Sequence, residues 1–258
     1  MSAHLCNEVM PPLALLAGGL GTRLGPLTAR VPKSLVTVAG EPFIAHQLRL
    51  LASQRAHDIV ICCGHFGDQI RNFVADGSRF GCRVRYSADV PSPLGTGGAI
   101  RNALPLLSEH FWIMYGDSYL PTPFAPVLRA FQTLGQPALM TVLANSNHWD
   151  VSNIEFADGR IVRYEKRTHS ARMKHIDYGL GIYSAELFGE WPKTFDLSDL
   201  QSCLVQHGVM AGYEVSERFY EVGSIAGLEE TEEFLAGRAE ASSVGGDSRT
   251  DGWYEVPA

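Results

Sequence analysis

The chain has 258 residues, of which 45% are hydrophobic and 19% charged, and its formal net charge is −7. The length suits one large domain, or one domain with a small appendage, and the composition is that of an ordinary soluble globular enzyme. The acidic balance argues against a general nucleic-acid binder, and the lack of an apolar run of about 18 residues argues against a membrane span.

The cysteines indicate reduced thiols. Their number is odd and no CxxC pair occurs, so neither a disulfide framework nor a zinc site is expected. The N-terminus lacks a basic start and its apolar run is short, which argues against a signal peptide and favours a cytoplasmic protein. The cysteines are Cys6, Cys62, Cys63, Cys82 and Cys203.

The first predicted element is the apolar run Leu13–Ala17, which follows Pro11 and Pro12 and is typical of a buried strand. A glycine-rich turn comes next, and its backbone N–H groups can form an anion-binding nest because no Cβ atom keeps a ligand away. Arg23 and Lys33 add a planar guanidinium and a mobile ammonium, which suit a polyphosphate. The turn has neither the Gly-Lys-Ser/Thr of a P-loop nor the third glycine of a dinucleotide fingerprint. Its glycines are Gly18, Gly19 and Gly21.

Strands and helices are predicted to alternate through the first half of the chain. Apolar runs indicate strands, and apolar residues at helical spacing indicate helices. This alternation predicts an α/β fold with a Rossmann-like, mainly parallel sheet and helices on both faces, and it predicts ligand binding beyond the carboxyl ends of the strands. The strands are Asp58–Cys63, Arg83–Ser87, Phe111–Tyr115 and Ala138–Leu143; the helices are Phe43–Ser53, Asp68–Ala75, Ile100–Leu107 and Pro123–Leu134.

The second half begins with a predicted β-hairpin, because Asp158-Gly159 is a strong turn signal between two strand-like segments. Further strands are expected at Ile176–Tyr183, Met210–Val215 and Phe219–Val222. Helices are expected at Leu197–His207, capped by Asp196 or Ser198, and at Ile225–Leu235. The Ser/Gly/Ala-rich residues 237–258 are expected to form a flexible tail.

Two more constellations suggest chemistry. Gly95, Thr96, Gly97 and Gly98 stand just before a predicted helix, where their N–H groups could bind a base edge or a phosphate. Asp117 ends an apolar strand, which suits a Mg²⁺ ion held by one or two carboxylates and substrate phosphates.

The strings LAGGLGTRLGPLT and VPKSLVTVAGEPFI resemble the signature of the sugar-1-phosphate nucleotidyltransferases, also called nucleotide-sugar pyrophosphorylases. The resemblance extends over roughly residues 13–235. It implies a glycosyltransferase-A-like nucleotidyltransferase fold in a single domain, residues 1–236. The nucleotide-binding half is expected at about residues 11–145 and the sugar-phosphate-binding half at about residues 146–236.

The resemblance also implies the reaction and its residues. A nucleoside triphosphate and a sugar 1-phosphate would give a nucleotide sugar and pyrophosphate, with Mg²⁺ as the cofactor. Nucleotide-binding residues would be Leu16, Ala17, Gly18, Gly19, Gly21, Thr22, Arg23, Gly95, Thr96 and Gly98. Catalytic residues would be Arg23, Lys33 and Asp117; metal ligands would be Asp117 and Glu221; sugar-phosphate-binding residues would be Glu165, Lys166, Asp177, Tyr178 and Gly179.

Each cation has an expected role. Arg23 would hold the β and γ phosphates, Lys33 would neutralise charge near the α-phosphate, and Lys166 would hold the sugar phosphate. Losing Arg23 or Lys33 is expected to cost about 3 kcal/mol or more of transition-state stabilisation. The chain departs from the family pattern at Glu221, where Asp is usual, and at Gly179, where Asn is usual, so Asp177 could supply a sugar contact instead.

The same strings, with PLGTGGAI, look most like the bacterial heptose-1-phosphate and mannose-1-phosphate guanylyltransferases, which favours GTP and a manno-configured sugar. A uridylyltransferase or another nucleotidyltransferase remains an alternative. Glu221 and Gly179 also leave open a non-catalytic, nucleotide-sugar-binding regulatory subunit. A nicotinamide-dependent oxidoreductase is disfavoured by the missing third glycine. The oligomeric state is not predicted.

Overall fold

The computed structural model describes residues 9–19, 22–64, 66–89 and 92–244, without the side chains of residues 22, 23 and 239–244. A central nine-stranded sheet has the order β10-β9-β11-β6-β1-β4-β5, and β8 pairs with both β11 and β12. Its strands are β1 (Leu13–Leu16), β4 (Asp58–Cys63), β5 (Arg83–Ala88), β6 (His110–Tyr115), β8 (Ala138–Ala144), β9 (Ile154–Ala157), β10 (Arg160–Tyr164), β11 (His175–Ser184) and β12 (Met210–Val215).

The sheet has a parallel centre and an antiparallel addition. Strands β6, β1, β4 and β5 run parallel, while β11 runs antiparallel to both β6 and β8. The predicted α/β fold is therefore confirmed, with a mixed sheet. Because β1, β4 and β6 are parallel neighbours, their carboxyl ends meet at one edge of the sheet.

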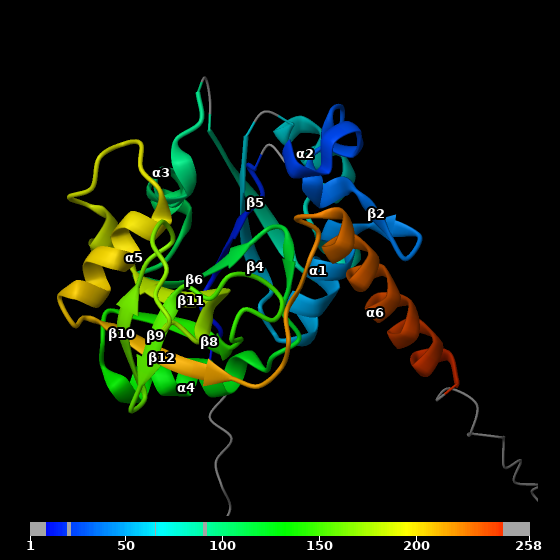
Figure 1. Ribbon diagram of the computed structural model, residues 1–258. Helices are drawn as coiled ribbons and strands as arrows, with labels where there is room; N and C mark the ends of the chain where they lie inside the picture. The colour runs from blue at the N-terminus through cyan, green and yellow to red at the C-terminus, as the bar shows by residue number, and fades with distance from the viewer. Residues whose placement is uncertain (1–8, 20–21, 65, 90–91, 245–258) are drawn as a thin grey trace, which may run out of the picture.

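Five of the six α-helices in the described residues pack on the sheet, and Figure 1 shows α3 and α5 together on one side, with α1 and α2 on the other; α6 packs instead on two small ladders outside the main sheet. The helices are α1 (Phe43–Ser53), α2 (Gly67–Val74), α3 (Gly95–Ala103), α4 (Phe124–Leu134), α5 (Leu197–Gln206) and α6 (Ile225–Val244). Two small ladders lie outside the main sheet: β2 (Thr37–Val38) with β3 (Glu41–Pro42), and β7 (Ser118–Tyr119) with β13 (Tyr220–Glu221).

The alternation of strand side chains creates two hydrophobic cores. Leu13 and Leu15 of β1 belong to the core beneath α1, α2 and α4. Ala14 belongs to the core beneath α3 and α5, and Leu16 packs against that same core. Successive strand residues point to opposite faces, so a strand covered on both faces reads as a continuous apolar run.

The predicted hairpin and most element bounds agree with the structure. β9 and β10 pair antiparallel, and Asp158 and Gly159 take the positive φ angles of 51° and 73° that a two-residue hairpin turn requires. Two predicted helix boundaries are wrong. α3 begins at Gly95 rather than at Ile100, and α6 continues to Val244 rather than ending at Leu235, so residues 237–244 of the expected tail are helical. The rest of that tail lies outside the described residues.

The described part of the chain includes no helix that is both long enough and apolar enough to cross a bilayer. Cys62, Cys63, Cys82 and Cys203 are free thiols, as expected, and the first three are buried. Burial raises the pKa of Cys82 to about 11, which is consistent with a packing role. Cys6 lies outside the described residues.

Candidate functional site

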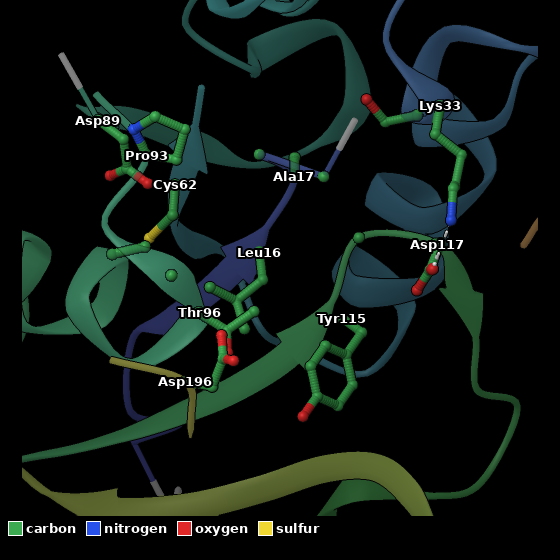
Figure 2. Close-up of a pocket in the computed structure, with 16 residues that line it drawn as sticks. Leu16, Ala17, Lys33, Cys62, Asp89, Pro93, Thr96, Tyr115, Asp117 and Asp196 are labelled. Atoms are coloured by element: carbon green, nitrogen blue, oxygen red, sulfur yellow. Dashed lines mark hydrogen bonds and ion pairs between the residues drawn. The ribbon is translucent and has the colours of Figure 1, made fainter. Parts of the chain in front are cut away.

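A cavity of about 320 Å³ lies where β1, β4 and β6 end, on the face of the sheet that α3 and α5 cover (Figure 2). Its floor is a row of three side chains, Tyr115, Leu16 and Cys62. Strand register explains the row, because Leu16 is paired with Tyr115 on β6 and with Cys62 on β4. The parallel sheet thus sets the floor at the edge where ligand binding is predicted.

The first glycine turn forms one wall of the cavity. Ala17, Gly18 and Gly19, which the sequence predicts as nucleotide-binding residues, all line it. A Cβ atom on Gly18 would lie 3.3 Å from the backbone nitrogen of Gly64, so the turn packs closely on the end of β4. Predicted site residue Gly21, and the side chains of Thr22 and Arg23, lie outside the described part of the structure.

Lys33 and Asp117 meet on the side of the cavity opposite Asp89 (Figure 2). The Lys33 Nζ atom is 3.0 Å from Asp117 Oδ2, and the two side chains are 13% and 29% exposed. Lys33 opens a short 3₁₀ turn after Pro32, and Asp117 follows the end of β6. Ser118 donates a hydrogen bond of 3.3 Å to the other Asp117 oxygen. Two predicted catalytic residues, distant in sequence, are therefore in direct contact.

Gly116 is needed for this arrangement. Its N–H donates to the carbonyl of Leu16 at 3.0 Å, and a Cβ atom on it would lie 2.6 Å from that same carbonyl oxygen. No larger residue fits so close to β1 without a backbone shift. The glycine therefore allows the chain to turn from β6 toward Asp117 across the end of β1.

Glu221 is held beside Asp117 by backbone pairing. Glu221 pairs with Ser118 in the β7–β13 ladder, and the N–H of Val222 donates to the carbonyl of Asp117 at 2.9 Å. Glu221 is not among the residues that line the cavity. In the described part of the chain no three His, Cys, Asp or Glu side chains form a metal cage. Mg²⁺ takes one or two carboxylates beside phosphates and water, a donor chemistry that Asp117 offers in the cavity, whereas the Glu221 carboxylate lies against Gly223.

The second glycine cluster is divided between the cavity and the packing of two helices. The N–H groups of Gly97 and Gly98 donate to the carbonyl of Phe195 at 3.0 and 3.1 Å, so they are not available to a base or a phosphate. Gly98 does not line the cavity, whereas Gly95 and Thr96 do. The glycines lie in the first turn of α3 and let it pack on the segment that leads into α5.

Thr96 joins the two helices as well. Its hydroxyl accepts a hydrogen bond of 2.8 Å from the N–H of Leu197, the first residue of α5. Asp196 occupies the N-cap position, as one of the two predicted caps, but its side chain makes no capping hydrogen bond. Asp196 lines the cavity instead.

A substitution at Gly97 tests this packing. A Cβ atom there would overlap the ring of Phe195, so Gly97→Ala should lower the free energy of unfolding by roughly 1–3 kcal/mol. Urea denaturation measures the change. Gly237→Ala is the matched control, because Gly237 lies in α6 and has nothing within 4 Å of the added Cβ. Equal stability of the two variants would show that the α3–α5 contact tolerates a side chain.

The predicted sugar-phosphate residues are only partly brought together. The Lys166 Nζ atom lies 3.5 Å from the hydroxyl of Tyr115 on the cavity floor. Asp177 lies close enough for its charge to influence Tyr115, and it accepts a 3.0 Å hydrogen bond from the N–H of Gly179. Burial raises the pKa of Asp177, while the Lys166 charge opposes that rise.

Two side chains of that predicted group do not face the cavity. Tyr178 is buried in the core on the opposite face, with its ring centroid 6.3 Å from that of Phe219, because adjacent residues of a strand point to opposite faces. Glu165 accepts a 3.0 Å hydrogen bond from the N–H of Arg167 and lines a separate depression next to α5. None of the five predicted sugar-phosphate residues is among those that line the central cavity, and Lys166 and Asp177 come close to it through Tyr115.

Several cavity residues are not among the predicted site residues, although Pro93, Ala99 and Gly116 belong to the candidate loops; they are Ser34, Cys62, Asp89, Pro93, Ala99, Tyr115, Gly116 and Asp196. Tyr115 and Cys62 could have been found by their register with Leu16, given the strand order. Asp89 follows the end of β5, and burial raises the pKa of its carboxyl group. Figure 2 shows Asp89 and Pro93 across the cavity from Lys33. No sequence pattern around Asp89 distinguishes it from an aspartate in an ordinary surface loop.

The chain is similar to known proteins in sequence and in fold. Residues 14–189 match the family model described as nucleotidyl transferase. The chain is 29% identical over 223 residues to the N-acetylmuramate alpha-1-phosphate uridylyltransferase of Neisseria meningitidis serogroup B, covering 84% of this chain and 95% of that protein. It is also 29% identical over 176 residues to the mannose-1-phosphate guanyltransferase beta-B of Xenopus laevis, covering 66% of this chain.

The chain spans about half the length of that Xenopus laevis relative, since the match covers 49% of it. Among solved structures, HddC from Yersinia pseudotuberculosis, crystallised with GMP-PN, superposes with a TM-score of 0.75. The identity is 23%, and the match covers 88% of this chain and all of that one. A likeness at this identity concerns the fold, and it agrees with the α/β architecture described above.

Proposed function

The chain belongs to the nucleotidyl transferase family, and from this premise we propose that it transfers a nucleotidyl group from a nucleoside triphosphate to a sugar 1-phosphate. The observation that carries the proposal is the contact between Lys33 and Asp117 in the cavity that the glycine turn also lines. A cation, a carboxylate and backbone N–H groups around one cavity are suited to a polyphosphate and its metal ion. The names of several relatives support the same reaction class.

The proposed reaction is an in-line displacement. An oxygen of the sugar phosphate attacks the α-phosphorus of the nucleotide and forms a new P–O bond. The bond from the α-phosphorus to the oxygen that bridges to the β-phosphorus breaks, and pyrophosphate leaves with that oxygen and its electron pair. Because no covalent enzyme intermediate is required, the residues act by positioning the reactants and by stabilising charge.

Each of three cationic side chains is proposed to bind a different phosphate group of the substrates. Lys33 neutralises charge near the α-phosphate, which requires its ammonium to move from Asp117 to the substrate. Arg23 binds the β and γ phosphates and the departing pyrophosphate, an assignment that rests on the sequence alone. Lys166, next to Tyr115 at the edge of the cavity, holds the phosphate of the sugar.

Mg²⁺ is the proposed cofactor, with Asp117 and Glu221 as its protein ligands. Asp117 lines the cavity, and the β7–β13 ladder keeps the Glu221 backbone beside it. The ion would supply charge neutralisation on the phosphates. Glu is one methylene group longer than Asp and ends in the same carboxylate group.

For the substrate pair we propose GTP and a heptose or mannose 1-phosphate. Support comes from the names of several relatives, which include mannose-1-phosphate guanyltransferases. The Neisseria meningitidis relative is named as a uridylyltransferase and the Streptomyces antibioticus relative as a thymidylyltransferase, so UTP and dTTP are the alternative donors to compare. We propose that the enzyme acts in the cytoplasm, where both substrate classes are made.

The experiment is pyrophosphate release with Mg²⁺, in which four nucleoside triphosphates are crossed with a panel of sugar 1-phosphates. Release is expected with GTP and mannose or heptose 1-phosphate at well above the rate of other pairs. Pyrophosphate release with a different substrate pair would support the proposed reaction and would show that GTP and mannose or heptose 1-phosphate are not the substrates. Nucleotide-sugar binding without release from any pair would favour the regulatory subunit and refute the enzyme.

A further inference from the structure

Tyr115 is a cavity residue that the proposed reaction does not yet use. It ends β6, and its side chain lies on the cavity floor next to Leu16. Figure 2 shows the ring beside the cavity, between Asp196 and Asp117. Its hydroxyl faces the half of the chain that carries the predicted sugar-phosphate residues, since Lys166 is its hydrogen-bonding neighbour. The side chain therefore stands between the two halves of the site.

Two contacts join Tyr115 to Lys166. The Lys166 Nζ atom lies 3.5 Å from the Tyr115 hydroxyl, at the outer limit of a hydrogen bond, and 5.2 Å from the centre of the ring. The second distance is within the roughly 6 Å range over which an ammonium is attracted to an aromatic face. Lys166 is otherwise an exposed residue after the end of β10, where nothing in the strand itself fixes its side chain.

Gly179 explains how the ring fits. It adopts a φ angle of +92°, and a Cβ atom on it would lie 3.2 Å from the Tyr115 Cδ2 atom and 3.7 Å from the Ser118 hydroxyl. A side chain at position 179 would therefore compete with the Tyr115 ring for the same space. The glycine at this position and the tyrosine at 115 are sterically complementary, and the ring occupies room that another residue would take.

The Tyr115 hydroxyl can accept a hydrogen bond from the Lys166 ammonium while donating its own proton to another acceptor. The contact between the two side chains therefore leaves the positive charge on Lys166.

We propose that Tyr115 is a positioning residue that holds Lys166 at the edge of the cavity, where the Lys166 ammonium binds the phosphate of the incoming sugar. The inference rests on the proposed function and assigns a residue to its sugar-phosphate subsite. The ring face and the hydroxyl of Tyr115 restrict the long, exposed side chain of Lys166. Lys166 therefore loses less rotamer entropy when the phosphate binds. The nucleotide does not require this contact.

The kinetic test separates the two substrates. Tyr115→Phe keeps the ring and removes the hydroxyl, so the KM for the sugar 1-phosphate should rise about 2- to 10-fold, the usual range for one hydrogen bond. The KM for the nucleoside triphosphate should stay within about 2-fold, because the cavity floor keeps its aromatic surface. Tyr115→Leu removes both contacts and should raise the sugar-phosphate KM further than Tyr115→Phe.

A double-mutant cycle with Lys166→Met shows whether the effect acts through Lys166. In the Lys166→Met background, Tyr115→Phe should change the sugar-phosphate KM by less than about 2-fold, because the interaction partner is gone. Equal effects of Tyr115→Phe in the two backgrounds would overturn the proposal. So would a rise in both KM values together, which would mark Tyr115 as a general structural residue.

A measurement without turnover keeps this inference separate from the proposed reaction. Brief acetylation of the folded protein, followed by peptide mass spectrometry, compares Lys166 with Lys174, another exposed lysine. Labelling of Lys166 relative to Lys174 should rise about 2- to 5-fold in Tyr115→Leu, the factor expected for a lost cation–π contact. Unchanged relative labelling refutes the positioning of Lys166. Increased labelling in a protein without transferase activity would support the positioning and refute the proposed reaction.

Discussion

Replacing Lys33 by Met should reduce the turnover number for pyrophosphate release by about 100-fold or more, which corresponds to roughly 3 kcal/mol of transition-state stabilisation. The ammonium lies in the cavity, only 13% exposed, and no other described cation forms an ion pair with Asp117. Charge develops on the α-phosphate and on the leaving pyrophosphate as the P–O bonds exchange. Methionine has a similar length and an apolar end, so the variant removes the charge while largely filling the space.

Lys174→Met is the control for this variant, since Lys174 is exposed and is not among the residues that line the cavity. The control should keep turnover within about 2-fold of the unmodified chain, as expected of a surface substitution. Thermal unfolding of both variants shows whether the fold is intact. A Lys33→Met protein that unfolds normally and turns over at near the original rate would remove Lys33 from the catalytic residues.

The central strands are predictable because burial on both faces leaves a readable pattern. Asp58–Cys63 is predicted and observed with identical bounds, since both of its faces are covered and every residue after Asp58 is apolar. Predicted and observed bounds also agree for α1, whose apolar residues recur at helical spacing. The predicted strands Leu13–Ala17 and Phe111–Tyr115 are also observed, as β1 and β6, and they place Gly18, Gly19 and Asp117 around one cavity at the carboxyl ends of the strands.

The second glycine cluster has a position in the fold that the sequence alone does not predict. Glycines are poor helix formers, so propensity places Gly95–Gly98 before the helix rather than in its first turn. Tertiary packing overrides that propensity, because Phe195 accepts from the N–H groups of Gly97 and Gly98 and leaves no room for side chains there. The contact joins segments about a hundred residues apart, and no local pattern signals it.

The sugar-phosphate half is predicted less well for a related reason. Asp177 and Tyr178 are neighbours in sequence, yet strand alternation points them to opposite faces, and only Asp177 lies near Tyr115. A sequence motif groups adjacent residues, but in a strand the side chains of adjacent residues point to opposite faces of the sheet. Arg23 remains a prediction from the sequence alone, with the expected effect of Arg23→Ala on turnover similar in size to that of Lys33→Met.

Replacing Asp117 by Asn should reduce turnover by about 100- to 1,000-fold and also weaken the response to Mg²⁺. The amide keeps the shape of the side chain and removes its negative charge, which an O-ligand for Mg²⁺ needs in order to compete with water. The Mg²⁺ concentration for half-maximal rate should rise by at least about 10-fold, a loss seen even for residues that only support metal ligands. Pyrophosphate release measured across a Mg²⁺ titration gives both quantities.

Asp58→Asn is a closely matched control. Asp58 has the same 29% side-chain exposure as Asp117 and also forms an ion pair, with Arg83 and Arg85, but it lies at the start of β4, the end of the strand away from the cavity. Both substitutions leave a cation without its carboxylate, so they should affect stability similarly, while only Asp117→Asn should change the Mg²⁺ dependence. Lys33→Met provides the opposite contrast, because removing the ammonium frees Asp117 and should not raise the Mg²⁺ requirement. If Asp117→Asn lowered turnover at an unchanged Mg²⁺ midpoint, Asp117 would serve only to orient Lys33, and the metal ligands would have to be sought elsewhere in the cavity.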